Sequence, residues 1–348
     1  MFISKRQIIS SGFGFFRRTG LHRLAVPFTG GAGAILMFHR VRPSQPRDFA
    51  PNLLLEITPD FLDAVISRVK ALGFMIVDID TALTMIAESS GQKFAVLTFD
   101  DGYKDTRDIA LPILEKHAAP FTMYVTTGFI ERTARLWWVE LEESIARLSR
   151  VRIAIGERLF DLPATNAAEK NAAFATLYQA LTDGSEEDLL AVIVDLARQA
   201  GLDPLSIPEE LCLDWAGIET LAKHELCTIG VHTLTHPRLG KLTETDMRRE
   251  LGDSRTQIEA HIGKEAEHLA YPVGNPVAAG VREFEAAAEL GFKSAVTTRP
   301  GMIFPAHDNR RTALPRLSIN GTWQSLDYVE ILLSGVPFAL WNKGRLVA

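Results

Sequence analysis

The chain has 348 residues and a formal net charge of −6, with 47% hydrophobic and 23% charged residues. These values are typical of an ordinary globular protein with a substantial core, and the negative charge gives no whole-chain case for a nucleic-acid partner. Two cysteines, Cys212 and Cys227, are too few for a disulfide framework and fit no zinc-finger spacing. We interpret them as buried thiols in a reducing compartment.

Residues 1–32 form a basic segment that we predict to be helical. No acidic residue precedes Asp48, and the segment carries five cations, at Lys5, Arg6, Arg17, Arg18 and Arg23. The apolar stretch 8–16 is too short to span a membrane, and no signal-peptide cleavage site follows it in the usual place. A basic helix with aromatic residues can rest on an anionic membrane surface, but we favour a helix docked on its own domain. We therefore expect a cytoplasmic protein, with peripheral contact at the inner membrane surface as the alternative.

From residue 33 onward, short apolar runs alternate with amphipathic helices. Strands are predicted at 34–38, 74–77, 94–99 and 121–125, and helices at 58–72, 81–87 and 109–117. Thr58 is the expected N-cap of the first of these helices, with Pro59 in the first turn and Gly73 at its end. Alternation at this pitch predicts an α/β fold with a parallel sheet, closed into a barrel or a relative of one.

The alternation stops between residues 130 and 208. This stretch is rich in Glu, Ala and Leu with helical periodicity, and 151–160 fits a small hairpin. It contains no catalytic motif and stands between two motif-bearing strands, so we interpret it as a helical insertion that forms a cap or side wall. The barrel, 33–129, resumes over 209–322, and 323–348 form a C-terminal segment. Strands are expected at 227–231, 266–271, 294–298 and 314–319, and helices at 214–226, 243–262 and 281–290.

Acidic residues and histidines follow predicted strands on either side of the insertion. Asp100 and Asp101 end the run Leu97-Thr-Phe-Asp-Asp-Gly102, and His232-Thr-Leu-Thr-His236-Pro237 follows 227–231. Barrel active sites lie at the C-terminal ends of the strands, where these side chains would meet. Zinc in a hydrolase typically takes three protein ligands and keeps a fourth position for water. Asp101, His232 and His236 would be the ligands, and Asp100 would take a proton from that water.

The two motifs resemble the first two motifs of polysaccharide deacetylases, the NodB-homology group or carbohydrate esterase family 4. The resemblance covers residues 33–128 and 210–322. It implies a distorted (β/α) barrel that hydrolyses N-acetyl groups on amino sugars of an oligo- or polysaccharide, such as a chitooligosaccharide. It also implies a divalent metal, usually zinc, with Co²⁺ or Mn²⁺ as alternatives. By motif position, Asp100 is the general base, and Asp101, His232 and His236 are the metal ligands.

The third motif departs from the family pattern. The family commonly has Arg-x-Pro-x-Gly, whereas this chain has Ala270-Tyr271-Pro272-Val273-Gly274. The family's arginine orients the catalytic aspartate, and we predict that Arg316, near the end of a late strand, replaces it; the alternative is a surface arginine. By the resemblance, the Val273 N–H donates to the oxyanion, and Tyr271 and Pro272 belong to the same pocket.

The remaining candidates are less specific. The family's last motif supplies a histidine as general acid, but the only histidine beyond residue 298 is His307, in a polar loop without a motif. The acid is therefore unassigned, unless Asp100 returns its proton. His39 ends the first strand and either lines the pocket or is structural. Trp137 and Trp138 either stack on a sugar or belong to the core.

Three functions stay open at this stage. Removal of N-acetyl groups from amino sugars is the one that we favour. The second is action of the same fold on another amide or on an O-acetyl ester. The third is a degenerate, non-catalytic barrel that binds glycans. The missing motif arginine and histidine suggest this third reading, whereas the intact Asp-Asp-Gly and His-x-x-x-His motifs argue against it.

Overall fold

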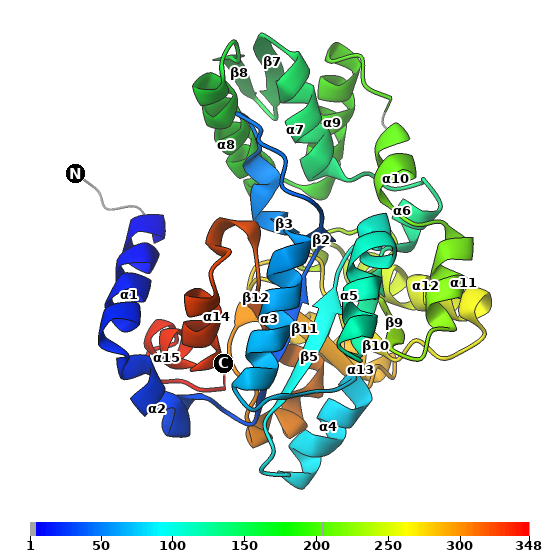
Figure 1. Ribbon diagram of the computed structural model, residues 1–348. Coiled ribbons are helices and arrows are strands. Elements are labelled where there is room, and N and C mark those ends of the chain that lie inside the picture. Colours follow the sequence, from blue (N-terminus) through cyan, green and yellow to red (C-terminus); the bar gives the residue numbers. More distant parts are fainter. Residues whose placement is uncertain (1–4, 204, 348) are drawn as a thin grey trace.

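The structure, a computed structural model, describes residues 5–203 and 205–347, with side chains from residue 11 onward (Figure 1). Seven parallel strands close into a barrel in the order β1-β12-β11-β10-β9-β6-β5, and β5 pairs back with β1. This confirms the predicted distorted (β/α) barrel. The strands are β1 (Gly33–Phe38), β5 (Phe94–Phe99), β6 (Phe121–Val125), β9 (Cys227–Val231), β10 (His268–Ala270), β11 (Ser294–Pro300) and β12 (Leu314–Ser318).

The distortion of the barrel has two sources. One edge of β5 pairs with β1, and two strands share its other edge: β4 (Met75–Ile76) pairs with the first residues of β5, and β6 pairs with the last. On the opposite side of the barrel the strand pairing is short, since β9 and β10 are paired only at Val231 and Leu269. In β11 a register shift follows Val296. The strands nevertheless point the same way, so their C-terminal ends share one mouth.

Helices cover the outside of the barrel. They are α3 (Pro59–Ala71), α4 (Ile79–Glu88), α5 (Leu111–Lys116), α11 (Trp215–Ala222), α12 (Glu244–Ile262) and α13 (Val281–Glu289). The predicted cap of α3 is present, since the Thr58 hydroxyl accepts from the Phe61 N–H at 3.2 Å. The predicted start of α4 was wrong by two residues, because Asp78 caps this helix through the Thr81 N–H. The predicted end of α11 at Leu226 was also too late, since the helix stops at Ala222 and leaves a turn before β9.

Residues 127–203 and 205–211 form a lobe over the barrel mouth (Figure 1). Its elements are α6 (Thr127–Ile130), α7 (Trp137–Arg147), β7 (Arg150–Ile155), β8 (Arg158–Pro163), α8 (Ala167–Asp183), α9 (Glu186–Gln199) and α10 (Ser206–Leu211). The strands β7 and β8 form an antiparallel hairpin where 151–160 predicted one. Leu141, Leu177 and Ile193 belong to the same buried cluster as the barrel core, so the lobe packs firmly on the barrel.

Two terminal helix pairs pack together beside the barrel. They are α1 (Lys5–Thr19) with α2 (Leu21–Thr29), and α14 (Leu326–Leu333) with α15 (Val336–Trp341). Arg23 pairs with Glu330 at 3.1 Å, and Phe13 packs edge-on against Tyr328 with ring centroids 4.3 Å apart. Among the described residues, no helix is both long and apolar enough to cross a membrane.

Short elements complete the chain. The strands β2 (Arg40–Val41) and β3 (Glu56–Ile57) pair near the mouth, and a 3₁₀ turn, η1 (Pro51–Leu55), lies between them. A short π-helix, η2 (Thr106–Ala110), precedes α5, and the 3₁₀ elements η3 (Leu239–Lys241), η4 (Pro305–Ala313) and η5 (Gly321–Trp323) lie in later loops. Of these, η1 contributes to the site described next.

Candidate active site

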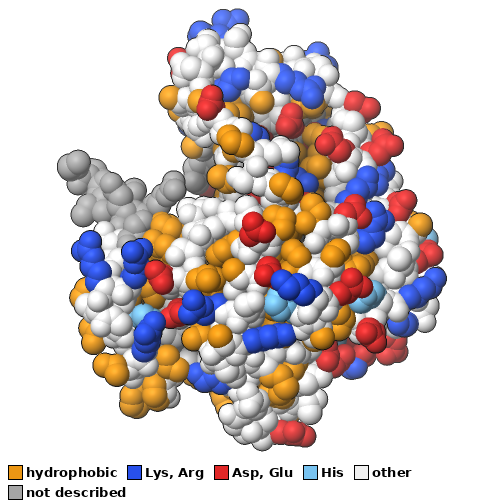
Figure 2. All heavy atoms as spheres, viewed as in Figure 1, with side chains coloured by type: hydrophobic (Ala, Val, Ile, Leu, Met, Phe, Trp, Pro, Cys, Tyr) orange, Lys and Arg blue, Asp and Glu red, His pale blue; other side chains and the backbone are white. Residues whose placement is uncertain are grey.

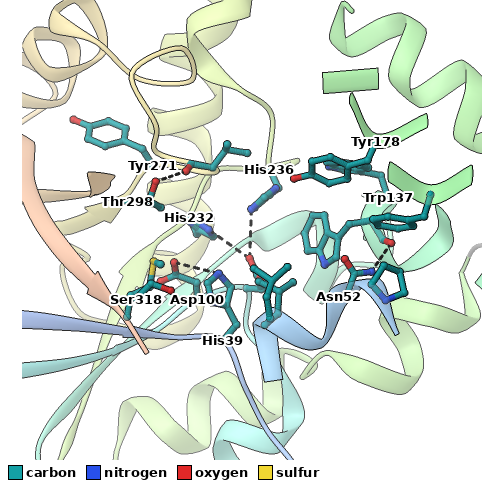
Figure 3. Close-up of a pocket in the computed structure, with 18 of the residues that line it drawn as sticks. His39, Asn52, Asp100, Trp137, Tyr178, His232, His236, Tyr271, Thr298 and Ser318 are labelled. Carbon is teal, nitrogen blue, oxygen red and sulfur yellow. Dashed lines mark hydrogen bonds and ion pairs between the residues drawn. The ribbon is translucent and has the colours of Figure 1, made fainter. Parts of the chain in front are cut away.

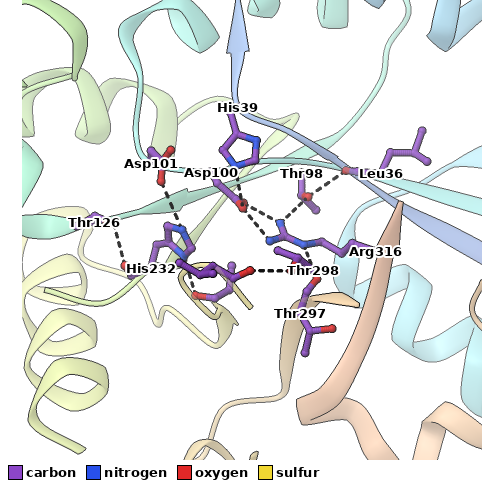
Figure 4. Close-up of polar contacts among 12 residues, drawn as sticks. Leu36, His39, Thr98, Asp100, Asp101, Thr126, His232, Thr297, Thr298 and Arg316 are labelled. Carbon is purple, nitrogen blue, oxygen red and sulfur yellow. Dashed lines mark hydrogen bonds and ion pairs between the residues drawn. The ribbon is translucent and has the colours of Figure 1, made fainter. Parts of the chain in front are cut away.

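The adjacent carboxylates of Asp100 and Asp101 lie at the end of β5 and point in different directions (Figure 4). All six residues of β5 are buried, which fixes the strand, and the Asp100 N–H continues the ladder to the Phe38 carbonyl at 3.1 Å. Asp101 then adopts a left-handed backbone conformation with φ 73°. The turn separates the two side chains, so that each meets a different set of partners.

Asp100 is held by Arg316 from β12. The guanidinium donates to both carboxylate oxygens at 2.7 Å, a bidentate geometry, and both side chains are buried. Arg316 also donates to the Thr297 carbonyl at 3.0 Å and to the Thr98 hydroxyl at 3.2 Å, which fixes its orientation. Burial acts to raise the pKa of Asp100, but Arg316, His232 and His39 lower it by more, so the net shift is downward. The carboxylate is therefore kept ionised, and the burial of Arg316 excludes a surface role.

Asp101, His232 and His236 converge on one point. The Asp101 Oδ1 atom lies 3.4 Å from the Nε2 atom of each histidine, and the three possible ligand atoms are within 4.8 Å of one another. A hydrogen bond would normally be shorter, whereas ligands around a tetrahedral zinc ion lie about 3.4 Å apart. Among the described residues, the buried Asp101 Oδ1 atom has no hydrogen-bond partner. The arrangement therefore fits three ligands of one cation.

The charges of this centre also call for a cation, because two buried carboxylates face a single guanidinium. Burial raises the pKa of Asp101, but His232 and His236 lower it by more, so it stays ionised. Burial lowers the pKa of His232, but Asp101 and Asp100 raise it by more; burial lowers the pKa of His236 to about 4. A divalent cation would supply the missing positive charge and keep both imidazoles neutral, which is the form that binds metal.

The histidine loop is held in place by several hydrogen bonds. The His232 Nδ1–H donates to the Ala270 carbonyl at 2.6 Å, which leaves the Nε2 lone pair facing Asp101. Glu250 of α12 accepts the N–H groups of Leu234 and Thr235, both at 2.9 Å, and so fixes the loop that carries His236. Such outer contacts orient the ligands before any cation arrives.

The third motif presents an unpaired backbone donor at the mouth. Val273 has φ 61°, a genuine outlier for a β-branched residue, and its N–H has no recorded partner among the described residues. The Thr298 hydroxyl donates to the Val273 carbonyl at 2.6 Å and holds the turn. Of the eight non-glycine residues with positive φ in the described chain, four are Asp101, Thr233, His236 and Val273. Strained backbone of this kind concentrates at functional sites.

A cavity of about 650 Å³ opens above these groups (Figure 3). Asp100, Asp101, His232 and His236 lie on its barrel side. The opposite wall comes from the lobe and from η1, with Trp137, Trp138, Phe174, Tyr178 and Asn52 among its residues. The insertion is therefore a side wall of the cavity, and both tryptophans line it while packing against neighbours. The ring centroids of Trp138 and His236 lie 4.8 Å apart, and those of Trp137 and Tyr178 lie 5.3 Å apart.

The other predicted residues are placed unevenly. His39 lines the cavity, with its Nε2 atom 4.0 Å from Asp100 Oδ2. Tyr271 borders the cavity, but its hydroxyl points away and donates to the Thr312 carbonyl at 2.8 Å, so the prediction of a pocket role holds only for its ring (Figure 3). Pro272 stands between Tyr271 and Val273, which line the cavity, but is not itself among the lining residues. His307 is buried in η4 and lies outside the cavity.

Several site residues escaped the sequence analysis. Glu250 is one acid among many on a long helix, and only its contacts with the histidine loop distinguish it. Asn52 sits in a short turn, where its side chain donates to the Trp138 carbonyl at 2.7 Å. Phe174 and Tyr178 stand one helical turn apart on α8, and this aromatic spacing was the only signal available.

The sequence profile of the polysaccharide deacetylase family matches residues 87–295, more than half of the chain. The chain belongs to the polysaccharide deacetylase family. The matched region includes the Asp-Asp-Gly and His-x-x-x-His motifs and the whole insertion, so the deacetylase motifs and the cavity wall lie in one matched stretch. No curated protein sequence matched the chain significantly.

Solved structures of deacetylases share the fold. IcaB from Ammonifex degensii superposes with a TM-score of 0.56 at 17% identity, over 88% of this chain and 98% of that one. The Streptococcus pyogenes deacetylase PplD, in complex with acetate, gives 0.54 at 20% identity, over 83% and 92%. A de-N-acetylase from Aggregatibacter actinomycetemcomitans gives 0.54 at 14% identity, over 86% and 99%. At these identities the likeness concerns the fold.

Proposed function

We propose that this deacetylase removes N-acetyl groups from amino sugars with the help of a divalent metal, zinc in the first instance. The observation that carries the proposal is the pairing of two functions at one strand end. Asp100 is held ionised by Arg316, and the next residue, Asp101, completes a three-ligand set with His232 and His236. A protein that only bound glycans would have no need of an oriented base beside a metal site.

The residues of the chain divide the reaction between them. A metal held by Asp101, His232 and His236 would lower the pKa of water and polarise the acetamide carbonyl. Asp100 takes the proton as water adds to that carbonyl. The Val273 N–H then donates to the oxygen on which negative charge develops. When the C–N bond breaks, Asp100 returns the proton to the leaving nitrogen, and acetate and a free amine are released.

The lobe suggests how a sugar is held. Trp137, Trp138, Phe174 and Tyr178 present aromatic surface opposite the carboxylates. Flat rings of this kind bury the apolar faces of a ligand and still leave its polar edges free to hydrogen-bond. We infer that the sugar ring lies between this wall and the metal site, which directs its N-acetyl group toward Asp100.

The proposal is tested by acetate release from N-acetylated oligosaccharides, with O-acetylated xylan as the competing substrate. We expect release from the N-acetyl substrates, loss after chelation, and recovery on adding Zn²⁺, Co²⁺ or Mn²⁺. Preferential release from the xylan would favour the ester alternative. Stoichiometric metal binding without release from any substrate would favour the non-catalytic, glycan-binding alternative.

We also propose that the protein is cytoplasmic and makes peripheral contact with an anionic membrane surface through its N-terminal helices. Leu24 and Phe28 of α2 are three-quarters exposed. Arg18 of α1 and Arg23 of α2 are exposed as well, and Arg23 stays exposed while it pairs with Glu330. Figure 2 shows hydrophobic and basic side chains gathered over this corner of the molecule. Apolar residues with flanking cations are what an anionic bilayer surface binds.

Vesicle flotation tests this contact. The full chain is expected to float with vesicles that contain anionic lipid, and a Leu24→Ser/Phe28→Ser double variant is expected to lose most of that binding. Leu159→Ser is the matched control, because Leu159 is equally exposed but lies on the hairpin of the lobe. Negligible flotation of the unaltered protein would contradict the membrane contact.

A further inference from the structure

An apolar groove of about 270 Å³ lies beside the active-site cavity, between β12 and the terminal helices. Its lining includes Phe13, Ile319, Trp323, Tyr328, Leu332 and Trp341. The rings of Trp323 and Tyr328 lie 5.0 Å apart, and Phe13 packs on Tyr328 from α1, so the two terminal helix pairs build the groove together.

The groove adjoins the active-site cavity. Ser318, the last residue of β12, lines both. Side chains alternate along a strand, so Ser318 lies on the same face as Arg316 and reaches the mouth, whereas Ile319 turns into the groove. A second shared border runs along the end of β11. Thr298 lines the cavity and a neighbouring depression, and that depression shares Pro300 and Trp341 with the groove.

The chemistry of the groove suits a hydrocarbon chain and not more sugar. Among the described residues, none that lines the groove is charged, and Ser318 and Asn320 are its only aliphatic polar side chains, whereas carboxylates and imidazoles face the aromatic wall of the cavity. Sugar rings carry a hydroxyl on most carbons, and most of these would lose hydrogen bonds with water without finding a partner in the groove. An apolar chain loses none and gains by leaving water.

A cation lies in the depression that borders both the cavity and the groove. Arg299 lines this depression, and it has no carboxylate partner among the described residues. Its Nη2 atom donates to the Ala279 carbonyl at 2.7 Å, and its guanidinium lies 5.0 Å from the centroid of the Phe284 ring. Its Nε atom is buried with no hydrogen-bond partner in the described chain. An arginine without a carboxylate partner leaves its positive charge available to a phosphate.

We propose that the substrate is an N-acetylated amino sugar joined through a phosphate to a long apolar chain. The sugar lies in the cavity, the phosphate at Arg299, and the chain in the groove, leaving past Trp341. This rests on the proposed function and names its substrate class. Leu340 and Trp341 are exposed at the outer end, where α15 packs on α2 and its exposed Leu24 and Phe28. The chain would therefore leave the groove at the corner proposed to meet the bilayer.

The first test compares two synthetic substrates that differ only in the chain, N-acetylglucosaminyl dodecyl phosphate and N-acetylglucosaminyl methyl phosphate. Each is assayed for acetate release below its micelle concentration. The dodecyl compound is expected to have a KM at least 10-fold lower. Leu332→Asp and Trp341→Ser should each remove most of this difference and leave the KM of the methyl compound unchanged, with Leu159→Ser as the control. Trp341 is exposed, so its replacement preserves the fold.

Equal KM values for the two compounds would overturn the proposal. The same holds if the groove variants raise the KM of both compounds alike. A second readout is independent of turnover: dodecyl phosphate without a sugar is titrated calorimetrically into the full chain. Binding is expected for the unaltered protein, with at least a 10-fold loss in Leu332→Asp and in Arg299→Gln. Absence of binding, or binding unchanged by both substitutions, would overturn the groove. Failure of the proposed function would look different, because no N-acetylated sugar would release acetate even though dodecyl phosphate bound.

Discussion

Asp100→Asn is expected to lower the rate of acetate release about 10²–10⁴-fold, the contribution of a positioned general base. The amide has nearly the same shape as the carboxylate and can still accept a hydrogen bond from Arg316, but it cannot take a proton from water. The three ligand side chains are untouched, so the purified variant should bind one equivalent of zinc. Acetate release and metal content, measured on the same preparation, check both parts.

His232→Ala provides the contrast to Asp100→Asn. It removes one of three ligands, and it should lose both the metal and the activity, because the Nε2 lone pair that faces Asp101 is gone. An Asp100→Asn protein with full activity would remove Asp100 from the mechanism. Loss of metal from Asp100→Asn in a protein that melts normally would show instead that Asp100 is itself a ligand.

The central part of this site could be predicted because it rests on local patterns. A buried run that ends in Asp100-Asp101 places both carboxylates at a barrel mouth, and His232 and His236 follow another such run. Arg316 was reachable for the same reason, since it stands near the end of a late strand. Each of these residues owes its position to its own strand, and strands of a parallel barrel share one direction.

The rest depended on contacts that no local pattern encodes. Glu250 acts through a loop about 15 residues away, and the aromatic wall meets the metal site only because the lobe folds back over the mouth. The early end of α11 also depends on the rest of the fold. The local pattern predicted a helix to Leu226, but the chain must turn before β9 to enter the barrel. The third motif predicted that Tyr271 belongs to the pocket, but its hydroxyl donates to the Thr312 carbonyl outside the pocket.

Arg316→Met is expected to lower the free energy of unfolding by about 3–5 kcal/mol near neutral pH, since it leaves the buried Asp100 without its partner. Activity should also fall, because the carboxylate loses the bidentate contact that aims it. Arg316→Lys should retain only part of the stability and part of the activity, since an ammonium group cannot reproduce two parallel hydrogen bonds. Denaturant unfolding of the metal-free protein measures the stability, and acetate release measures the activity.

The double variant Asp100→Asn/Arg316→Met separates a lost ion pair from a lost side chain. Replacing both partners removes the uncompensated charge, so the double variant should be more stable than Arg316→Met alone even though it carries one more substitution. Additive losses in the two single variants would mean that the pair contributes little. In that case the effect of Arg316→Met would come from the packing of the guanidinium.

The pH dependence of stability identifies the group responsible. In the unaltered protein the pKa of Asp100 lies below its usual value, so the ion pair contributes stability above about pH 4, and this stability is lost as the pH falls through the lowered value. In Arg316→Met the burial of Asp100 remains without its main counter-charge, so its pKa should rise above the usual value. The free energy of unfolding of the variant is then lowered most at neutral pH. Its difference from that of the unaltered protein should shrink as the pH falls below about 4. A difference that stays constant from pH 7 to pH 3 would assign the loss to packing and remove the electrostatic role of Arg316.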